Sequence, residues 1–105
     1  MISSSFNKII KCIKIFSDTT GKSEKEMVFL ETGLQEGKSI RKMLTNFSFK
    51  KIISIEIDKF QIDKVKKELQ YENDYSKIIF IQGDSANKLK EIYDQNIDII
   101  YLDAH

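Results

Sequence analysis

The sequence contains one cysteine, one histidine and no proline among its 105 residues. A single thiol, Cys12, cannot form a disulfide within the chain, so the cysteine usage does not indicate an oxidising compartment. Cys12 also has no histidine close to it, because the single histidine, His105, is the last residue. A cysteine nucleophile is therefore not expected.

Long apolar runs and an excess of one charge are also lacking. No run approaches the roughly 20 apolar residues that a membrane-spanning helix needs, and lysines interrupt the N-terminal segment where a signal peptide would be continuous. The net charge is +1, which does not favour nucleic acid or an anionic membrane as a partner. Lys8, Lys11 and Lys14 are expected to form the wet face of a helix. A cytoplasmic protein is the default expectation.

Apolar residues are present in two alternating patterns. They recur at three- and four-residue steps over about residues 5–17 and again within 40–47, 62–69 and 86–93, which predicts amphipathic helices. Short continuous runs at 27–30, 52–55, 78–81 and 97–102 predict strands buried on both faces. Strands that alternate with helices predict an α/β fold, with a Rossmann-like parallel sheet of four strands and helices on both faces.

Residues 1–105 are expected to form a single domain, with an N-terminal helix over about 5–17 followed by a Rossmann-like half over 27–105. The sequence stops after the fourth predicted strand. We therefore expect the domain to be truncated there and incomplete at the C-terminus.

An acidic residue follows each predicted strand. The four are Glu31, Glu56, Asp84 and Asp103. Ligands of open α/β sheets bind beyond the carboxyl ends of the strands, so these four positions predict a ligand site. The rival explanation is that strands simply become polar where they reach water.

The loop after the first strand contains two glycines. Gly33 permits a tight turn, and Gly37 lets the backbone approach a ligand where the next helix begins. Glu36 in the same loop disfavours a polyphosphate. Glu56 is suited to a ribose diol, because a carboxylate can accept two charge-assisted hydrogen bonds. Asp84 is suited either to the exocyclic amine of a purine or to capping the following helix.

Together these segments resemble the first four motifs of class I S-adenosylmethionine-dependent methyltransferases. The motifs are residues 28–33 with Gly37, 54–58, 83–85 and 97–105. In that family the glycine loop holds the methionine end of the cofactor, the second acid binds the ribose and the third lies beside the adenine. The cofactor-binding residues that the resemblance implies are Glu31, Thr32, Gly33, Gly37, Glu56, Ile57, Asp84 and Ser85. Gln35 stands where the commonest form of the loop has a glycine.

The fourth motif would lie nearest the chemistry. The resemblance implies that Asp103 faces the methyl donor, the acceptor or, in the catechol-methyltransferase-like branch, a divalent metal. His105 is a candidate general base, although it also ends the chain. The family's domain continues with further strands that carry much of the acceptor site. The chain therefore looks like the N-terminal half of such an enzyme, with a small-molecule methyl acceptor expected.

Other functions remain as alternatives. The pair Gly37-Lys38 resembles a P-loop, but Thr32 stands where that motif requires its first glycine. A nicotinamide enzyme would need a richer glycine pattern, and an aminopropyltransferase usually has more glycine and acid in this loop. A non-catalytic cofactor-binding remnant is a further alternative. So is a fragment that forms a homodimer through the exposed edge of its fourth strand.

Overall fold

The computed structural model describes residues 4–34, 36–92 and 95–102. Helices and strands alternate as predicted, in the order α1 (Ser4–Thr20), β1 (Val28–Thr32), α2 (Lys38–Asn46), β2 (Lys51–Glu56), α3 (Lys59–Leu69), β3 (Ile78–Gln82), α4 (Ser85–Ile92) and β4 (Ile99–Leu102). Short 3-10 turns at Glu24–Glu26 and Tyr75–Lys77 precede β1 and β3. No helix within the described ranges is long and apolar enough to span a lipid bilayer.

The first helix runs to Thr20, further than its apolar pattern predicts. Asp18, Thr19 and Thr20 have modest helix propensity, yet the helix continues until Gly21 adopts a left-handed φ of 75°. The Gly21 N–H then donates to the Ser17 carbonyl at 2.9 Å, which caps the last turn. Lys8, Lys11 and Lys14 are exposed on this helix, as expected for its wet face.

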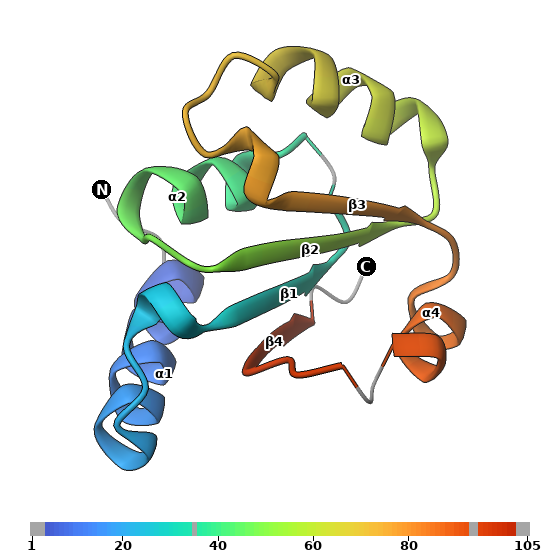
Figure 1. Cartoon of the computed structure of the whole chain (residues 1–105). Coiled ribbons are helices and arrows are strands. Elements are labelled where there is room, and N and C mark those ends of the chain that lie inside the picture. The colour runs from blue at the N-terminus through green and yellow to red at the C-terminus, as the bar shows by residue number, and fades with distance from the viewer. Residues whose placement is uncertain (1–3, 35, 93–94, 103–105) are drawn as a thin grey trace.

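All four strands are parallel, in the order β3-β2-β1-β4. The strand β1 is central, with Phe29 registered against Ile52 of β2 and Ile99 of β4. From β1 the chain first adds β2 and β3 on one side and then returns to place β4 on the other side, as Figure 1 shows. The direction in which strands are added therefore reverses between β1 and β4. Open α/β folds bind ligands at the carboxyl ends of the strands beside such a reversal.

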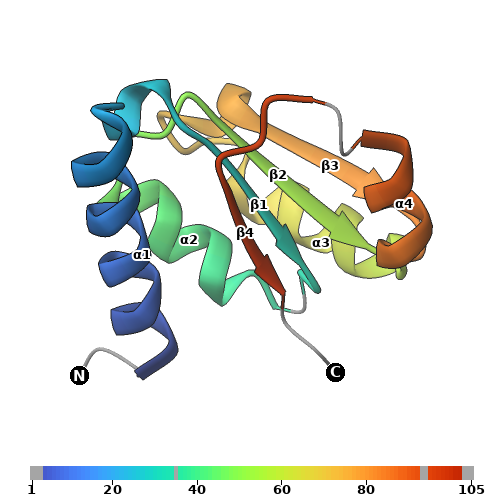
Figure 2. The same ribbon diagram turned by 90° about the horizontal axis from the view of Figure 1, so that it is seen from below.

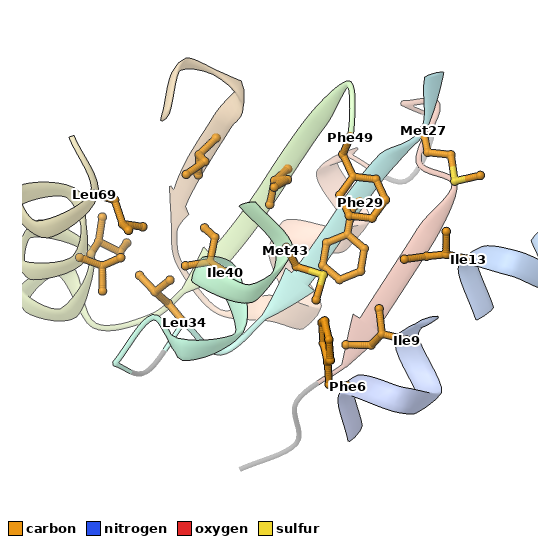
Figure 3. Packing of buried hydrophobic residues seen from close by; sticks show 14 residues of the cluster. Phe6, Ile9, Ile13, Met27, Phe29, Leu34, Ile40, Met43, Phe49 and Leu69 are labelled. Carbon is orange, nitrogen blue, oxygen red and sulfur yellow. The ribbon is translucent and has the colours of Figure 1, made fainter. Parts of the chain in front are cut away.

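Helices cover both faces of the sheet. Figure 2 shows α2 and α3 behind the sheet and α4 in front of it, with α1 beside β4. The larger cluster joins α1, α2 and α3 to the face that carries Phe29 and Ile52. In Figure 3, Phe29 stands between Met43 and Phe49, and its ring centroid lies 5.1 Å from that of Phe49. The predicted fold class, a four-stranded Rossmann-like sheet with helices on both faces, is confirmed.

The second face is covered only in part. Ile92 of α4 packs with Leu30, Ile53 and Ile55, whereas Ile100 of β4 is 51% exposed. Among the described strands, β4 is hydrogen-bonded to β1 alone. An apolar groove of about 570 Å³ lies along its other edge. The groove lies between β4 and the C-terminal part of α1, with Cys12, Ile15, Phe16 and Ile99 in its lining.

Asp98, the residue just before β4, is hydrogen-bonded to the start of β1. Asp98 accepts the Val28 N–H at 2.7 Å through one carboxylate oxygen and pairs with the Lys22 ammonium at 2.8 Å through the other. Its own N–H donates to the Val28 carbonyl at 3.0 Å. The Asp98 side chain is only 10% exposed, so losing it would leave the part-buried Val28 N–H without its acceptor.

We expect Asp98→Ala to lower the free energy of unfolding by about 1–3 kcal/mol, because the part-buried Val28 N–H loses its acceptor. Asp98→Asn keeps an acceptor oxygen for Val28 and should cost less. Lys22→Gln removes only a partner that is itself 33% exposed and should change stability least. Urea denaturation of the three variants checks this order. Equal losses in all three would contradict the structural role given to the Asp98 carboxylate.

Candidate cofactor-binding site

The carboxyl ends of β1, β2 and β3 lie side by side at one edge of the sheet (Figure 1). The ladder of backbone bonds continues past the strands, because the Gly33 N–H donates to the Ile55 carbonyl and the Gly83 N–H to the Glu56 carbonyl, both at 2.9 Å. The three loops that the sequence singled out are thus joined to one another. Because paired parallel strands of similar length end at the same edge of the sheet, the loops that follow them become neighbours.

Glu56 connects two of these loops through its side chain. One carboxylate oxygen accepts the Leu34 N–H of the glycine loop and the other accepts the Asp58 N–H of the turn after β2, each at 2.9 Å. Because a carboxylate offers about four acceptor positions, such a group can hold two loops and also bind hydroxyl donors. The bond to Leu34 is a feature that the sequence did not reveal, since it depends on which loops become neighbours.

Apolar side chains are exposed at the same corner. Ile57, which directly follows Glu56, is 67% exposed, and Phe60 in the first turn of α3 is 73% exposed. Asp58 caps this helix by accepting the Phe60 N–H at 2.9 Å, which fixes the turn between them. The sequence pattern did not single out Phe60. Its exposure could have been expected, because Phe60 falls outside the buried stripe of Ile62, Val65 and Leu69 on the same helix.

Glu31 lies inside the sheet rather than at its rim. The strand β1 extends to Thr32, two residues beyond the apolar run that predicts it, and Glu31 is only 1% exposed. Its neighbours in register are Ser54 of β2 and Tyr101 of β4, and the Ser54 hydroxyl donates to its carboxylate at 3.3 Å.

The second half of the glycine loop is a tight turn packed against α3. Gly37 has a φ of 82° and donates its N–H to the Leu34 carbonyl at 2.9 Å. A Cβ at this position would lie 3.1 Å from both methyl groups of Val65. The sequence explained this glycine by close approach of a ligand. The structure adds a second reason, which is the close approach of α2 to α3.

Charged groups at the same turn pair with each other. Glu36 is exposed, and its carboxylate lies 3.7 Å from the Lys38 ammonium. A P-loop lysine would instead reach toward a phosphate. The local geometry therefore gives no support to the phosphate-binding alternative.

The structure resolves one of the two roles suggested for Asp84. Its carboxylate accepts the Asn87 N–H at 3.1 Å, so Asp84 caps α4, which begins at Ser85. The role beside a purine amine stays a prediction. Asp103 and His105 fall outside the described residues, as does Gln35. Within the described ranges, no group of three or more His, Cys, Asp or Glu side chains is arranged to hold a metal ion.

The fold and the order of the loops define a class. They are similar to those of class I S-adenosylmethionine-dependent methyltransferases, and the resemblance inferred from the motifs is confirmed by a solved structure. That structure is a dimethyladenosine transferase from Plasmodium falciparum, with a TM-score of 0.65 and 26% sequence identity. The match covers 93% of this chain and 32% of the transferase, so the chain spans about a third of its length. No family model and no curated protein matches the sequence.

The steric role of Gly37 can be tested against Gly21. Both have a left-handed φ, but a Cβ at Gly21 would meet nothing within 4 Å. Gly21→Ala should therefore cost only the backbone term, about 1–2 kcal/mol. Gly37→Ala should cost that amount and about 1–3 kcal/mol more from overpacking against Val65. Thermal and urea unfolding of the two variants give the comparison, and equal losses would show that α3 tolerates the added methyl group.

Proposed function

We propose that this chain binds S-adenosylmethionine at the carboxyl edge of β1, β2 and β3 and supplies the cofactor half of a methyltransferase. The observation that carries the proposal is the Glu56 carboxylate, which joins the glycine loop to the turn after β2 beside the exposed Ile57. The likeness to the dimethyladenosine transferase supports the same general activity.

The nucleoside end of the cofactor would lie over β2. Glu56 would accept hydrogen bonds from the ribose hydroxyls, and the exposed Ile57 would pack on one face of the adenine. Asp84 and Ser85 at the start of α4 would lie near the adenine amine, with the Asp84 carboxylate also capping its helix. Phe60 widens the apolar surface available to the base.

The methionine end would lie over β1. Gly33 and Gly37 shape the loop, and the buried Glu31 and Thr32 directly precede it at the end of β1. Acidic residues at both ends, Glu31 and Glu56, suit a cationic donor, whereas a polyphosphate would be repelled by them.

The bound cofactor would supply a methyl group on a sulfonium sulfur. For transfer, the protein must hold the acceptor in line with the carbon–sulfur bond that breaks, and it must accept a proton if the acceptor carries one. Asp103 and His105 are the candidates for orienting the acceptor and taking that proton. Histidine has an unperturbed pKa near 6.5, so His105 would suit the role of general base at neutral pH.

The acceptor has two candidate classes. A small molecule is the expectation from the near-neutral charge of the chain. An adenosine base is favoured by the structural neighbour, which is named for the dimethylated adenosine it makes. Methyl incorporation from labelled cofactor into an adenosine-containing oligonucleotide, set against a pool of small hydroxylated and amine acceptors, would distinguish the two.

A non-catalytic role is the second candidate function. The edge of β4 and the groove beside it leave apolar surface exposed within the described residues, with Ile100 51% and Leu102 62% exposed. A chain that binds cofactor without turnover, or that pairs with a second copy along β4, would fit this surface. Cofactor binding and turnover therefore need separate measurements.

Calorimetric titration tests cofactor binding. We expect S-adenosylmethionine and S-adenosylhomocysteine to bind, and Mg-ATP and NAD not to bind. Glu56→Ala should weaken binding by about 10–100-fold, since it removes charge-assisted hydrogen bonds worth roughly 1.5–3 kcal/mol. Binding of Mg-ATP alone would refute the proposal.

The control must separate lost ligand contacts from lost folding. Glu72→Ala removes an exposed carboxylate in the turn between α3 and β3, away from the carboxyl edge, and should bind like the wild type. Glu56→Gln keeps one acceptor oxygen and should fall between wild type and Glu56→Ala. A thermal melt of each variant shows whether the sheet is retained.

A further inference from the structure

Arg41 links the glycine loop to the helix on its far side. It lies in the first turns of α2, and one guanidinium nitrogen, Nη1, donates to the Glu36 backbone carbonyl at 3.0 Å. The other, Nη2, pairs with the Glu68 carboxylate near the end of α3. One planar side chain therefore holds a loop carbonyl and an acidic group on another helix at the same time.

The Glu36 carbonyl belongs to the same peptide unit as the Gly37 N–H. Because the peptide unit is planar, fixing the carbonyl of Glu36 also fixes the direction of the Gly37 N–H. That N–H donates to the Leu34 carbonyl at 2.9 Å and closes the turn. Arg41 thus acts on the conformation of the turn itself and not only on its position.

The two ends of the loop are fastened to different elements. Its first half is tied to β2, where Glu56 accepts the Leu34 N–H. Its second half is tied to α3, through Arg41 with Glu68 and through the contact that Gly37 makes toward Val65. The loop that these contacts hold includes Gly33 and Gly37, which are proposed to shape the site for the methionine end of the cofactor.

We infer that Arg41, held in place by Glu68, is a positioning residue that sets the glycine loop for the methionine end of the ligand. This role rests on the proposed function. The two side chains are 39% and 41% exposed, so their pairing adds little to global stability. Its main effect is to reduce the ordering that the loop would otherwise undergo on binding, which raises affinity without a new ligand contact.

The geometry of the guanidinium is essential to this role. Arginine donates through a rigid fork and can serve the carbonyl and the carboxylate together, whereas the ammonium of lysine is a single point charge. Arg41→Lys therefore keeps the charge and removes the bridge. Glu68→Gln keeps an acceptor oxygen and removes the charge that orients the guanidinium.

The test compares two ligands on the full 105-residue chain by calorimetric titration. S-adenosylhomocysteine occupies both ends of the site, and adenosine occupies the nucleoside end alone. We expect Arg41→Lys and Glu68→Gln to weaken S-adenosylhomocysteine by about threefold to tenfold, while adenosine changes less than about twofold. In amide hydrogen exchange without ligand, the Gly37 N–H should exchange faster in both variants than in the wild type.

Lys77→Gln is the matched control. It removes an ion pair with Asp74 whose side chains are 36% and 42% exposed, and which lies in the turn before β3. It should leave both affinities and the Gly37 exchange rate unchanged. Wild-type binding of S-adenosylhomocysteine with no change in either variant would overturn the role of Arg41, as would equal weakening of both ligands. A wild type that binds neither ligand would refute the proposed function itself, whereas unchanged Gly37 exchange would refute the loop-ordering role alone.

Discussion

The parallel pairing of β1 with β2 is the constraint on which the rest of the structure depends. It aligns Leu30 with Ile53 and Thr32 with Ile55, and the ladder continues to the bond between Gly33 and the Ile55 carbonyl. Because parallel strands point the same way, every loop that follows a strand is delivered to one edge of the sheet. The helices α2 and α3 must then cross back over the same face, and their apolar stripes fill the space above Phe29 and Ile52.

At that edge, the groups best suited to a ligand also hold the protein together. Glu56 accepts N–H groups from two loops, Asp84 caps α4, and Gly37 permits both a left-handed turn and the approach of α3. Such double use places the donors and acceptors before a ligand arrives, which lowers the entropy lost on binding. It also means that a loss of affinity in a site variant is informative only beside a measurement of folding.

The elements themselves could be predicted because their signals are local. Continuous apolar runs such as Ile52-Ile53 predict buried strands, and steps of three and four residues predict the helices that cover them. The exact ends of the helices and strands could not be predicted from these local signals, because they depend on the folded chain. Thr20 ends α1 only because Gly21 turns left-handed, and Glu31 is buried only because β1 continues to Thr32 between two other strands.

The sequence by itself determined the alternation of strands and helices, the acids near the carboxyl ends of the strands and the resemblance to class I methyltransferases. Each of these depends on residue type and spacing along the chain. The tertiary structure alone decided that Leu34 bonds to Glu56, that Glu31 lies beside Ser54 and that Arg41 reaches Glu68. These contacts join residues far apart in the sequence, and their partners become defined only when the strand order and the packing of α2 on α3 are fixed.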